Sequence, residues 1–293
     1  MAQSNSAIIN GQISDTDTSG TRNKKRERLL SVKSIPFILM HLVCFTAILT
    51  GVSYKAVLLG VALYVIRMFA LTAGYHRYFS HRSYSTSRTF QFLLAVLGCT
   101  AAQKGPLWWA AHHRQHHRYT DSEGDVHSPR QNGFWWAHVG WVLSTRYEPT
   151  NFEDIRDFAR FPELRWLNNW HIVPAFLLAV ICYLVLGWQG LVWGFFISTV
   201  VLYHGTFSIN SLSHMFGTQR YETGDDSRNN LLLALLTSGE GWHNNHHHYM
   251  ASVRQGFFWW EIDLSFYGLK LLEAMRLVWN LRLPPARLLA QGT

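Results

Sequence analysis

Histidine is the residue type whose spacing in this chain best suggests chemistry. The sequence holds 16 histidines, and the pattern H-x-x-H-H occurs twice, at residues 113–117 and 243–247. On an α-helix, positions i, i+3 and i+4 lie within about 60° of one another, so each triplet can turn three ring nitrogens to one side. Neutral imidazoles bind transition metals well, whereas clustered imidazolium cations repel one another. The two triplets therefore favour metal binding.

Three more histidines join these triplets as candidate ligands. His76 and His81 are five residues apart, about 140° around a regular helix, so they can share a site only if the helix ends or bends between them. His214 is a single candidate that follows a long apolar stretch. The complete set of candidate ligands is His76, His81, His113, His116, His117, His214, His243, His246 and His247.

Nine ligands exceed what one metal ion can hold. A closed structural zinc site takes four, and no cysteine lies in any of these clusters. The count predicts two metal ions with four or five nitrogens each and a position left for oxygen or water, while the choice of metal stays open. We interpret His41, His127, His138, His171 and His204 as hydrogen-bonded structural residues, and His112 and His248 as neighbours of ligands.

Four apolar stretches of about 17 to 20 residues are long enough to span a bilayer. They lie at about 35–53, 56–75, 172–188 and 190–209. The short connections within each pair predict two antiparallel hairpins. A basic cluster at 24–28 favours a cytoplasmic N-terminus, so the positive-inside rule places 76–171 and 210–293 in the cytoplasm as well. The candidate ligands therefore share one side of the membrane.

The remaining segments complete the predicted organisation. Residues 1–30 are expected to form a disordered basic tail, 31–285 a single membrane domain whose cap comprises 76–171 and 210–285, and 286–293 a C-terminal tail. A fifth apolar stretch, 90–106, is expected to lie in the interface or inside the protein, because one crossing would separate His113 from His76. Residues 266–281 have the spacing of an amphipathic helix that stops before Pro284.

The composition excludes two classes of protein. The net charge is +8, but no nucleic-acid-binding motif accompanies it, so no nucleic-acid partner is expected. Cys44, Cys99 and Cys182 are odd in number and lie in apolar stretches, which indicates buried hydrophobic residues rather than disulfides.

Four segments resemble the histidine motifs of a known family, the membrane-bound fatty acid desaturases, specifically the Δ9, stearoyl-CoA desaturase-like group with its bacterial-type acyl desaturases. They are GYHRYFSHRSY (74–84), WWAAHHRQHHRYTD (108–121), NSLSHMFG (210–217) and GEGWHNNHHHY (239–249). The resemblance covers residues 35–280. It implies an all-α integral membrane protein with four transmembrane helices in two hairpins and a cytosolic helical cap that carries a His-rich dimetal site.

The resemblance also implies an activity and its residues. Two irons, O2 and two electrons would insert a cis double bond, at Δ9, into a long saturated acyl chain on CoA or on a lipid. The nine histidines would bind the irons and Asn210 a metal-bound water. Thr206 and Phe207 would kink the acyl tunnel, and Tyr64 would face its far end. Arg77, Arg114 and Arg146, with Arg82 and Arg118, would contact phosphates of CoA or a phospholipid, or anchor the cap to anionic head groups.

One departure from the family pattern concerns the acyl carrier. Animal acyl-CoA desaturases have an Arg-Asp pair where this chain has Ala111-His112, which leaves the contact to CoA in doubt. No haem-binding pattern occurs, so a separate electron donor, a ferredoxin or cytochrome b5, and its reductase are expected. We expect Asp121, Glu240 and Asn244 to orient the ligand imidazoles.

Two alternatives remain open. The same scaffold could hydroxylate an acyl chain or an alkane, which would leave oxygen on the product. A non-catalytic membrane metal-binding or transport protein should carry polar or ionisable residues in the middle of its spans, and here Arg67 is the only clear charge within one. The expected location is a membrane, the cell membrane if the chain is bacterial, crossed several times with both termini in the cytoplasm.

Overall fold

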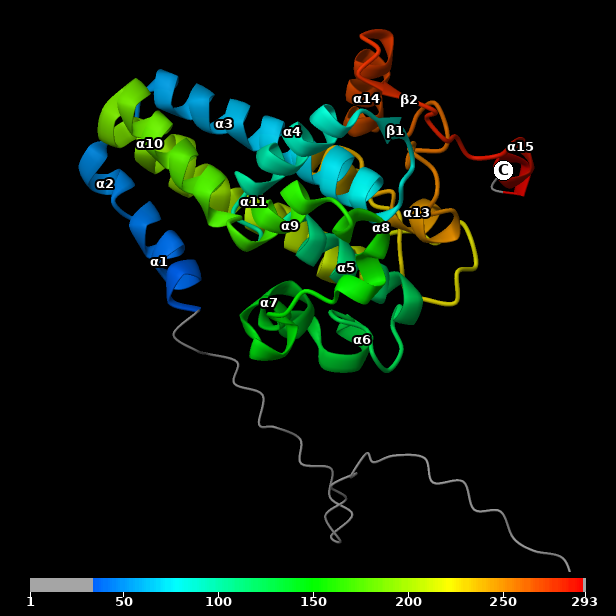
Figure 1. The fold of residues 1–293 in the computed structure, drawn as a ribbon. Coiled ribbons are helices and arrows are strands. Elements are labelled where there is room, and N and C mark those ends of the chain that lie inside the picture. The colour runs from blue at the N-terminus through cyan, green and yellow to red at the C-terminus, as the bar shows by residue number, and fades with distance from the viewer. Residues whose placement is uncertain (1–33, 292–293) are drawn as a thin grey trace, which may run out of the picture.

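The computed structural model describes residues 34–291, so the predicted N-terminal tail lies outside the described residues. The described part is mostly helical, as expected, and contains one two-stranded antiparallel sheet, in which β1 (Ser85–Thr86) pairs with β2 (Val278–Trp279) (Figure 1).

Two of the helices that the structure describes are long and apolar enough to cross a membrane. The first joins α3 (Tyr54–Phe69) to the π-helix η2 (Ala70–Ser80) without a break. The second runs from Ile172 to His214 through α10 (Ile172–Gln189), η6 (Gly190–Ile197), α11 (Ser198–Ser211) and η7 (Leu212–His214).

The second long helix is folded back on itself at Leu186 and Gly187, which leave the helical conformation. Gly187 has a φ of +58°, a left-handed conformation that glycine adopts readily. Gly190 then lies so close to α10 that an added Cβ would stand 2.1 Å from the carbonyl oxygen of Cys182. These two glycines permit the tight hairpin that the sequence predicts close to residues 188–190.

The first predicted span is shorter than expected. It divides into α1 (Ile35–Cys44) and α2 (Ala47–Thr50), which together form a shorter apolar helical segment. The turn that follows α2 lies beside the α10–η6 turn, because Gln189 Nε2 donates to the carbonyl of Thr50 (2.9 Å) and Trp193 Nε1 donates to that of Gly51 (3.0 Å). Both turns are therefore at the same end of the molecule, away from α5, α8 and α13 (Figure 1).

The cap consists of shorter helices. They are α4 (Arg88–Cys99), α5 (Pro106–Tyr119), α6 (Pro129–Asn132), η3 (Trp136–Gly140), α7 (Trp141–Leu143), η4 (Thr145–Tyr147), η5 (Phe152–Ile155), α8 (Arg156–Ala159), α9 (Pro162–Asn169), α12 (Leu231–Leu236), α13 (His243–His248), α14 (Leu264–Ala274) and α15 (Ala286–Gln291). α4 corresponds to the fifth apolar stretch and packs on η2, where Tyr75 contacts Gly98 and its hydroxyl lies 3.1 Å from Cys99 Sγ.

One prediction at the C-terminal end is wrong. The amphipathic helix α14 ends at Ala274 rather than near residue 281, because residues 278–279 pair with β1 as a strand. The expected tail is helical over Ala286–Gln291, and the Tyr221 hydroxyl donates to the carbonyl of Leu288 (3.2 Å). The three cysteines are unpaired, and Cys99 and Cys182 are buried, as predicted.

The apolar residues are distributed in two ways. A buried core lies between η2, α4, α5 and α9 and contains Leu71, Phe79, Leu94 and Leu164. By contrast, α3 and α10 expose large apolar side chains on their outer faces, such as Leu184, which is 75% exposed. Extended exposed apolar surface of this kind fits contact with lipid.

Candidate metal centre

The nine candidate histidines, which lie on η2, α5, η7 and α13 or, for His81, directly after η2, converge in two groups. The first contains His76, His81, His113, His117 and His246, and the second contains His116, His214, His243 and His247. Within each group the ring nitrogens lie within 4.8 Å of one another. Each H-x-x-H-H triplet is divided between the groups instead of serving one, which the sequence analysis did not foresee.

The π-helical winding of η2 explains how His76 and His81 meet. The His81 N–H donates to the carbonyl of His76 (3.2 Å), five residues earlier, which is the hydrogen bond of a π-helix. The wider turn brings positions i and i+5 to nearly the same side of the chain. The two rings are 4.8 Å apart, centre to centre.

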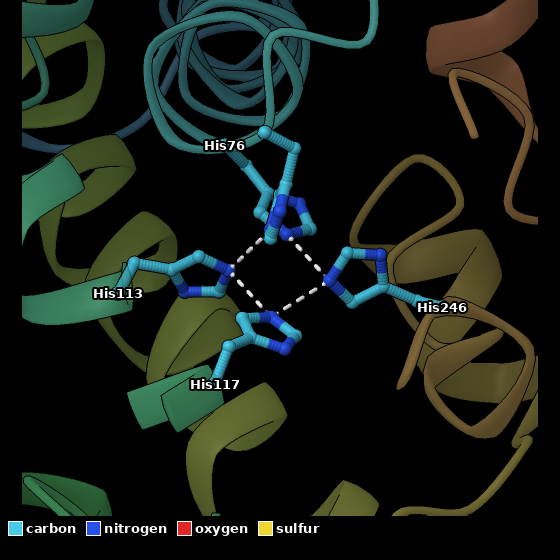
Figure 2. A group of neighbouring side chains, drawn as sticks. His76, His113, His117 and His246 are labelled. Carbon is cyan, nitrogen blue, oxygen red and sulfur yellow. Dashed lines mark hydrogen bonds between the residues drawn. The ribbon is translucent and has the colours of Figure 1, made fainter. Parts of the chain in front are cut away.

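In the first group the ring nitrogens face a common centre, and Figure 2 shows His76, His113, His117 and His246 arranged around it. The Nε2 atoms of His76 and His246 are 3.0 Å apart, those of His113 and His117 3.0 Å, and those of His117 and His246 2.9 Å. His81 Nε2 lies 2.9 Å from that of His113.

The second group has the same character. His214 Nε2 lies 3.1 Å from His243 Nε2. The Nε2 atoms of His116 and His247 are buried and make no hydrogen bond within the described structure. An unpaired buried nitrogen costs about 1 to 3 kcal/mol unless a ligand satisfies it.

These distances fit metal ions. A metal–nitrogen bond of about 2.1 Å and a right angle at the metal place neighbouring nitrogens about 3.0 Å apart. The observed separations of 2.9 to 3.1 Å match that value. The donor set is also chemically suitable, because burial and repulsion between neighbouring rings hold the pKa values of His81, His113, His117 and His246 well below their usual range. The rings are therefore neutral and able to coordinate.

Four carboxylates support the second ring nitrogens. His214 Nδ1 lies 3.0 Å from Asp121, His116 Nδ1 2.8 Å from Asp125 and His247 Nδ1 2.9 Å from Asp225. His76 Nδ1 contacts Glu240. Such partners fix the orientation of a ligand ring and raise its basicity.

Two of these carboxylates are among the expected orienting residues, Asp121 and Glu240. The third residue expected to orient a ring, Asn244, contacts no ligand histidine through these bonds: its side-chain oxygen accepts from the backbone N–H groups of Arg220 and Tyr221 (2.8 Å each). The sequence analysis missed Asp125 and Asp225. Asp125 lies only nine residues after His116, the ring that it contacts, so this pairing had a local signal in the sequence. Asp225 lies in a loop that precedes α13 and had no such signal.

The carboxylates are ionised. Burial by itself raises the pKa of Asp225, but hydrogen bonds from His247, Ser227 and Thr223 outweigh it and hold that pKa well below its usual range. The same balance, with His116 as the main partner, lowers the pKa of Asp125. Each charged carboxylate lies against Nδ1 of its ring, which favours a cation at the opposite nitrogen, Nε2.

A cavity of about 780 Å³ reaches His113 of the first group. Its walls are mostly apolar and come from α1, α10, η6 and α11, and Thr206, Phe207 and Asn210 lie where it approaches His113. Gln103 Nε2 donates to Thr206 Oγ1 (2.9 Å). A second cavity of about 40 Å³ continues from Thr206 and Asn210 towards His76, His116 and His243.

Some predicted site residues lie elsewhere. Tyr64 is outside the lining of both cavities, and its hydroxyl donates to the carbonyl of Leu236 (2.6 Å). The prediction that Arg77 faces a substrate phosphate is wrong, because every residue of η2 is buried and Arg77 pairs with Glu240 (3.0 Å) and Asp263 (2.9 Å).

The other predicted cations differ in their surroundings. Arg114 donates to both carboxylate oxygens of Asp157 and to the carbonyls of Phe79 and Ser80, so it holds the end of η2 in place. Arg146 is exposed on the loop whose residues Leu143 and Glu148 line the large cavity.

Two histidines that were not expected to be ligands lie close to the groups. His127 is buried, its ring is 4.2 Å from that of His116, and it forms a third, overlapping group with His116 and Asp125. His112 Nδ1 lies 2.8 Å from the carbonyl of Trp108, and its ring packs on that indole.

Comparison with known proteins gives consistent results. A sequence model of the fatty acid desaturase family matches residues 53–276. The chain is 36% identical over 258 residues to an sn-1 stearoyl-lipid 9-desaturase of Anabaena variabilis, covering 86% of this chain and 93% of that protein. It is 35% identical over 268 residues to the Delta-9 acyl-lipid desaturase 1 of Arabidopsis thaliana (89% and 86%) and 37% identical over 249 residues to the acyl-CoA 5-desaturase AL21 of Anemone leveillei (84% and 77%).

Proposed function

This chain belongs to the fatty acid desaturase family and is a fatty acyl desaturase, and from that premise we propose that it inserts a cis double bond at Δ9 into a long saturated acyl chain of a membrane lipid. Lipid is preferred to CoA for two reasons. First, Ala111-His112 replaces the Arg-Asp pair of animal acyl-CoA desaturases. Second, this chain covers more of the two lipid 9-desaturases named above than of the acyl-CoA 5-desaturase. The expected alternatives, a hydroxylase and a non-catalytic metal-binding protein, are outcomes of the test below.

One observation carries the proposal. Two groups of convergent histidine nitrogens lie where a large apolar cavity continues into a smaller one, and the larger has room for an acyl chain. We propose two irons as the metals, each group holding one, with Asn210 placed at the mouth of the smaller cavity to hold a water. When bound, the irons would supply the oxidising power, drawn from O2, that removes hydrogen from an unactivated methylene.

The protein's own residues would determine which methylenes react. The methylenes of a saturated chain are nearly alike in reactivity, so position must come from orientation. The apolar walls would hold the chain and exclude water, and the Gln103–Thr206 hydrogen bond would fix the wall where the chain passes the histidines. The reaction converts one acyl chain, O2, two electrons and two protons into the unsaturated chain and two waters.

The proposed membrane arrangement keeps four crossings in two hairpins, with both histidine groups and both termini on the cytoplasmic side. It is supported by the adjacent turns at Gly51 and Gly187 and by the exposed apolar faces of α3 and α10. The α1–α2 segment would form the shortest crossing.

The electrons would come from a separate protein, a ferredoxin or cytochrome b5 with its own reductase. Arg82 and Arg118 directly follow the ring positions His81 and His117, and their side chains are 61% and 52% exposed. Arg82 pairs with Asp157 (3.6 Å) and Arg118 with Asp154 (2.9 Å), so the surface beside the first group carries charges of both signs, which an electron carrier would have to match.

The test is expression in a host that lacks its own Δ9 desaturase, followed by mass spectrometry of the fatty acids and by metal analysis of the purified protein. We expect Δ9 monounsaturated chains and about two irons per chain. His246→Ala should abolish the product, whereas His248→Ala, on the same helix but outside both groups, should not. A product that retains oxygen would show a hydroxylase, and no product with bound metal a non-catalytic protein.

A further inference from the structure

Three histidines outside the metal groups form a chain of hydrogen bonds between three elements. His41 belongs to α1, His204 to α11 and His138 to η3. The Nε2 atoms of His41 and His204 are 3.2 Å apart, and His204 Nδ1 lies 3.0 Å from His138 Nε2. His138 Nδ1 then lies 2.9 Å from the hydroxyl of Ser211. The sequence analysis treated each of these histidines as an isolated structural residue.

The contacts assign a single direction of donation to the chain. His41 Nδ1 lies 2.8 Å from the carbonyl of Phe37 and must donate to it, which leaves Nε2 of a neutral ring as an acceptor. His204 therefore donates from Nε2 and accepts at Nδ1 from His138. At the far end, the Ser211 hydroxyl donates to the carbonyl of Phe207 (3.0 Å) and lies 2.9 Å from His138 Nδ1. Each ring nitrogen of the three histidines therefore has a partner within 3.2 Å.

An aromatic stack runs beside this chain of histidines. Phe37 stacks on Tyr203 (5.6 Å between ring centres), and Tyr203 stacks on Phe207 (5.7 Å). All three rings line the large cavity, whereas His41, His138 and His204 are outside its lining. The histidines therefore support the aromatic wall from behind, and His138 contacts Phe207 edge to face (6.0 Å).

The position of α1 depends strongly on these contacts. No residue of α1 is buried, so this helix has little packing to hold it. Yet Phe37 and Met40 of α1 form part of the cavity wall. In apolar surroundings, hydrogen bonds between polar side chains hold helices together where packing is weak.

We propose that His41, His204 and His138 form a clamp that positions the aromatic wall of the acyl cavity and thereby sets which carbons of the chain lie beside the metal groups. The proposal rests on the proposed function, since it assigns specificity to residues behind the substrate cavity. These are positioning residues, because they act through Phe37, Tyr203 and Phe207.

The experiment compares His204→Leu, which removes both central hydrogen bonds, with His204→Gln, whose amide can donate at one end and accept at the other. Val201→Ala, one turn earlier on the exposed face of α11, is the control. The readouts are the positional isomers of the product, by mass spectrometry, and the iron content.

We expect His204→Leu to raise the share of neighbouring positional isomers by about tenfold at unchanged iron content, since a displacement of about 1 Å at a reacting centre changes rates by up to about a hundredfold. His204→Gln should restore part of the selectivity, and Val201→Ala should match the wild type. If His204→Leu does not accumulate, His41→Leu, which removes only one end of the chain, replaces it.

Three results would overturn the clamp: an unchanged isomer profile in the leucine variant, an equal shift in Val201→Ala, or loss of iron in step with the shift. The wild-type product alone tests the Δ9 assignment. The clamp is tested by the difference between each variant and the wild type, whichever position the wild-type enzyme modifies.

Discussion

His113 and His116 are three residues apart on α5, and their ring nitrogens belong to different metal groups. The second triplet mirrors this division, since His246 joins the first group while His243 and His247 join the second. Each of the two helices therefore contributes to both groups, and the groups are held at a fixed separation by α5 and α13.

Removing one histidine should affect one metal more than the other. We expect His116→Ala to lower the iron content from about two to about one per chain, because the first group keeps all five of its rings. His117→Ala should deplete the other iron. Iron measured by mass spectrometry on purified protein, with His248→Ala as control, tests this. Equal loss of both irons in either variant would contradict the assignment.

The carboxylate behind His247 should control how tightly metal is held. We expect Asp225→Asn to weaken iron binding by about 10- to 100-fold, the usual effect of losing such a partner. Asp226→Asn is the matched control, because Asp226 pairs with Arg130 at the surface instead. Iron retention against a chelator, measured for both variants, distinguishes them, and equal retention would exclude the orienting role.

The large cavity should limit the length of the acyl chain. Ala179 lines it from α10, whereas Ile181, two residues later, is 54% exposed and outside the lining. We expect Ala179→Phe to shift the products towards shorter chains, because the added ring fills part of the cavity. Ile181→Phe should leave the products unchanged. Chain-length profiles of lipid fatty acids provide the measurement, and identical profiles would mean that the chain lies elsewhere.

The buried Arg77 should matter for stability. Arg77→Met leaves Glu240 and Asp263 without their cation, and breaking a buried pair in this way costs about 3 to 5 kcal/mol. Arg88→Met removes an exposed partner of Glu163 and should leave the stability nearly unchanged, because surface ion pairs contribute little. Thermal unfolding in detergent compares the two, and similar losses would show that Arg77 is not structurally central.

Much of the site could be predicted from the sequence because most of its histidines are close together in the chain, at a spacing that fits one face of a helix. The two triplets lie on helices, as expected, and the nine candidate histidines converge in two groups. The division of each triplet was not predictable, since it depends on how α5 and α13 face each other. The meeting of His76 with His81 depends on a π-helix, whose hydrogen-bond pattern leaves no distinctive signal in residue type.

Arg77 shows why the sequence misplaced some substrate residues. Its position beside His76 in a polar segment suggested an exposed cation, but η2 is enclosed on all sides by α4, α5 and α14. Its carboxylate partners lie more than 160 residues away in the chain, and no local pattern announces them. The strand at 278–279 was missed for the same reason, because its only partner is the distant β1.

The order of the ligands along the polypeptide has a consequence for biosynthesis. Both groups draw on the segment 243–247, which is the last ligand segment to leave the ribosome. Neither group is complete before residues 243–247 have been synthesised, so metal loading must follow synthesis of all four ligand segments. A cell short of the metal would then accumulate polypeptide in which α13 has no metal ion to bind.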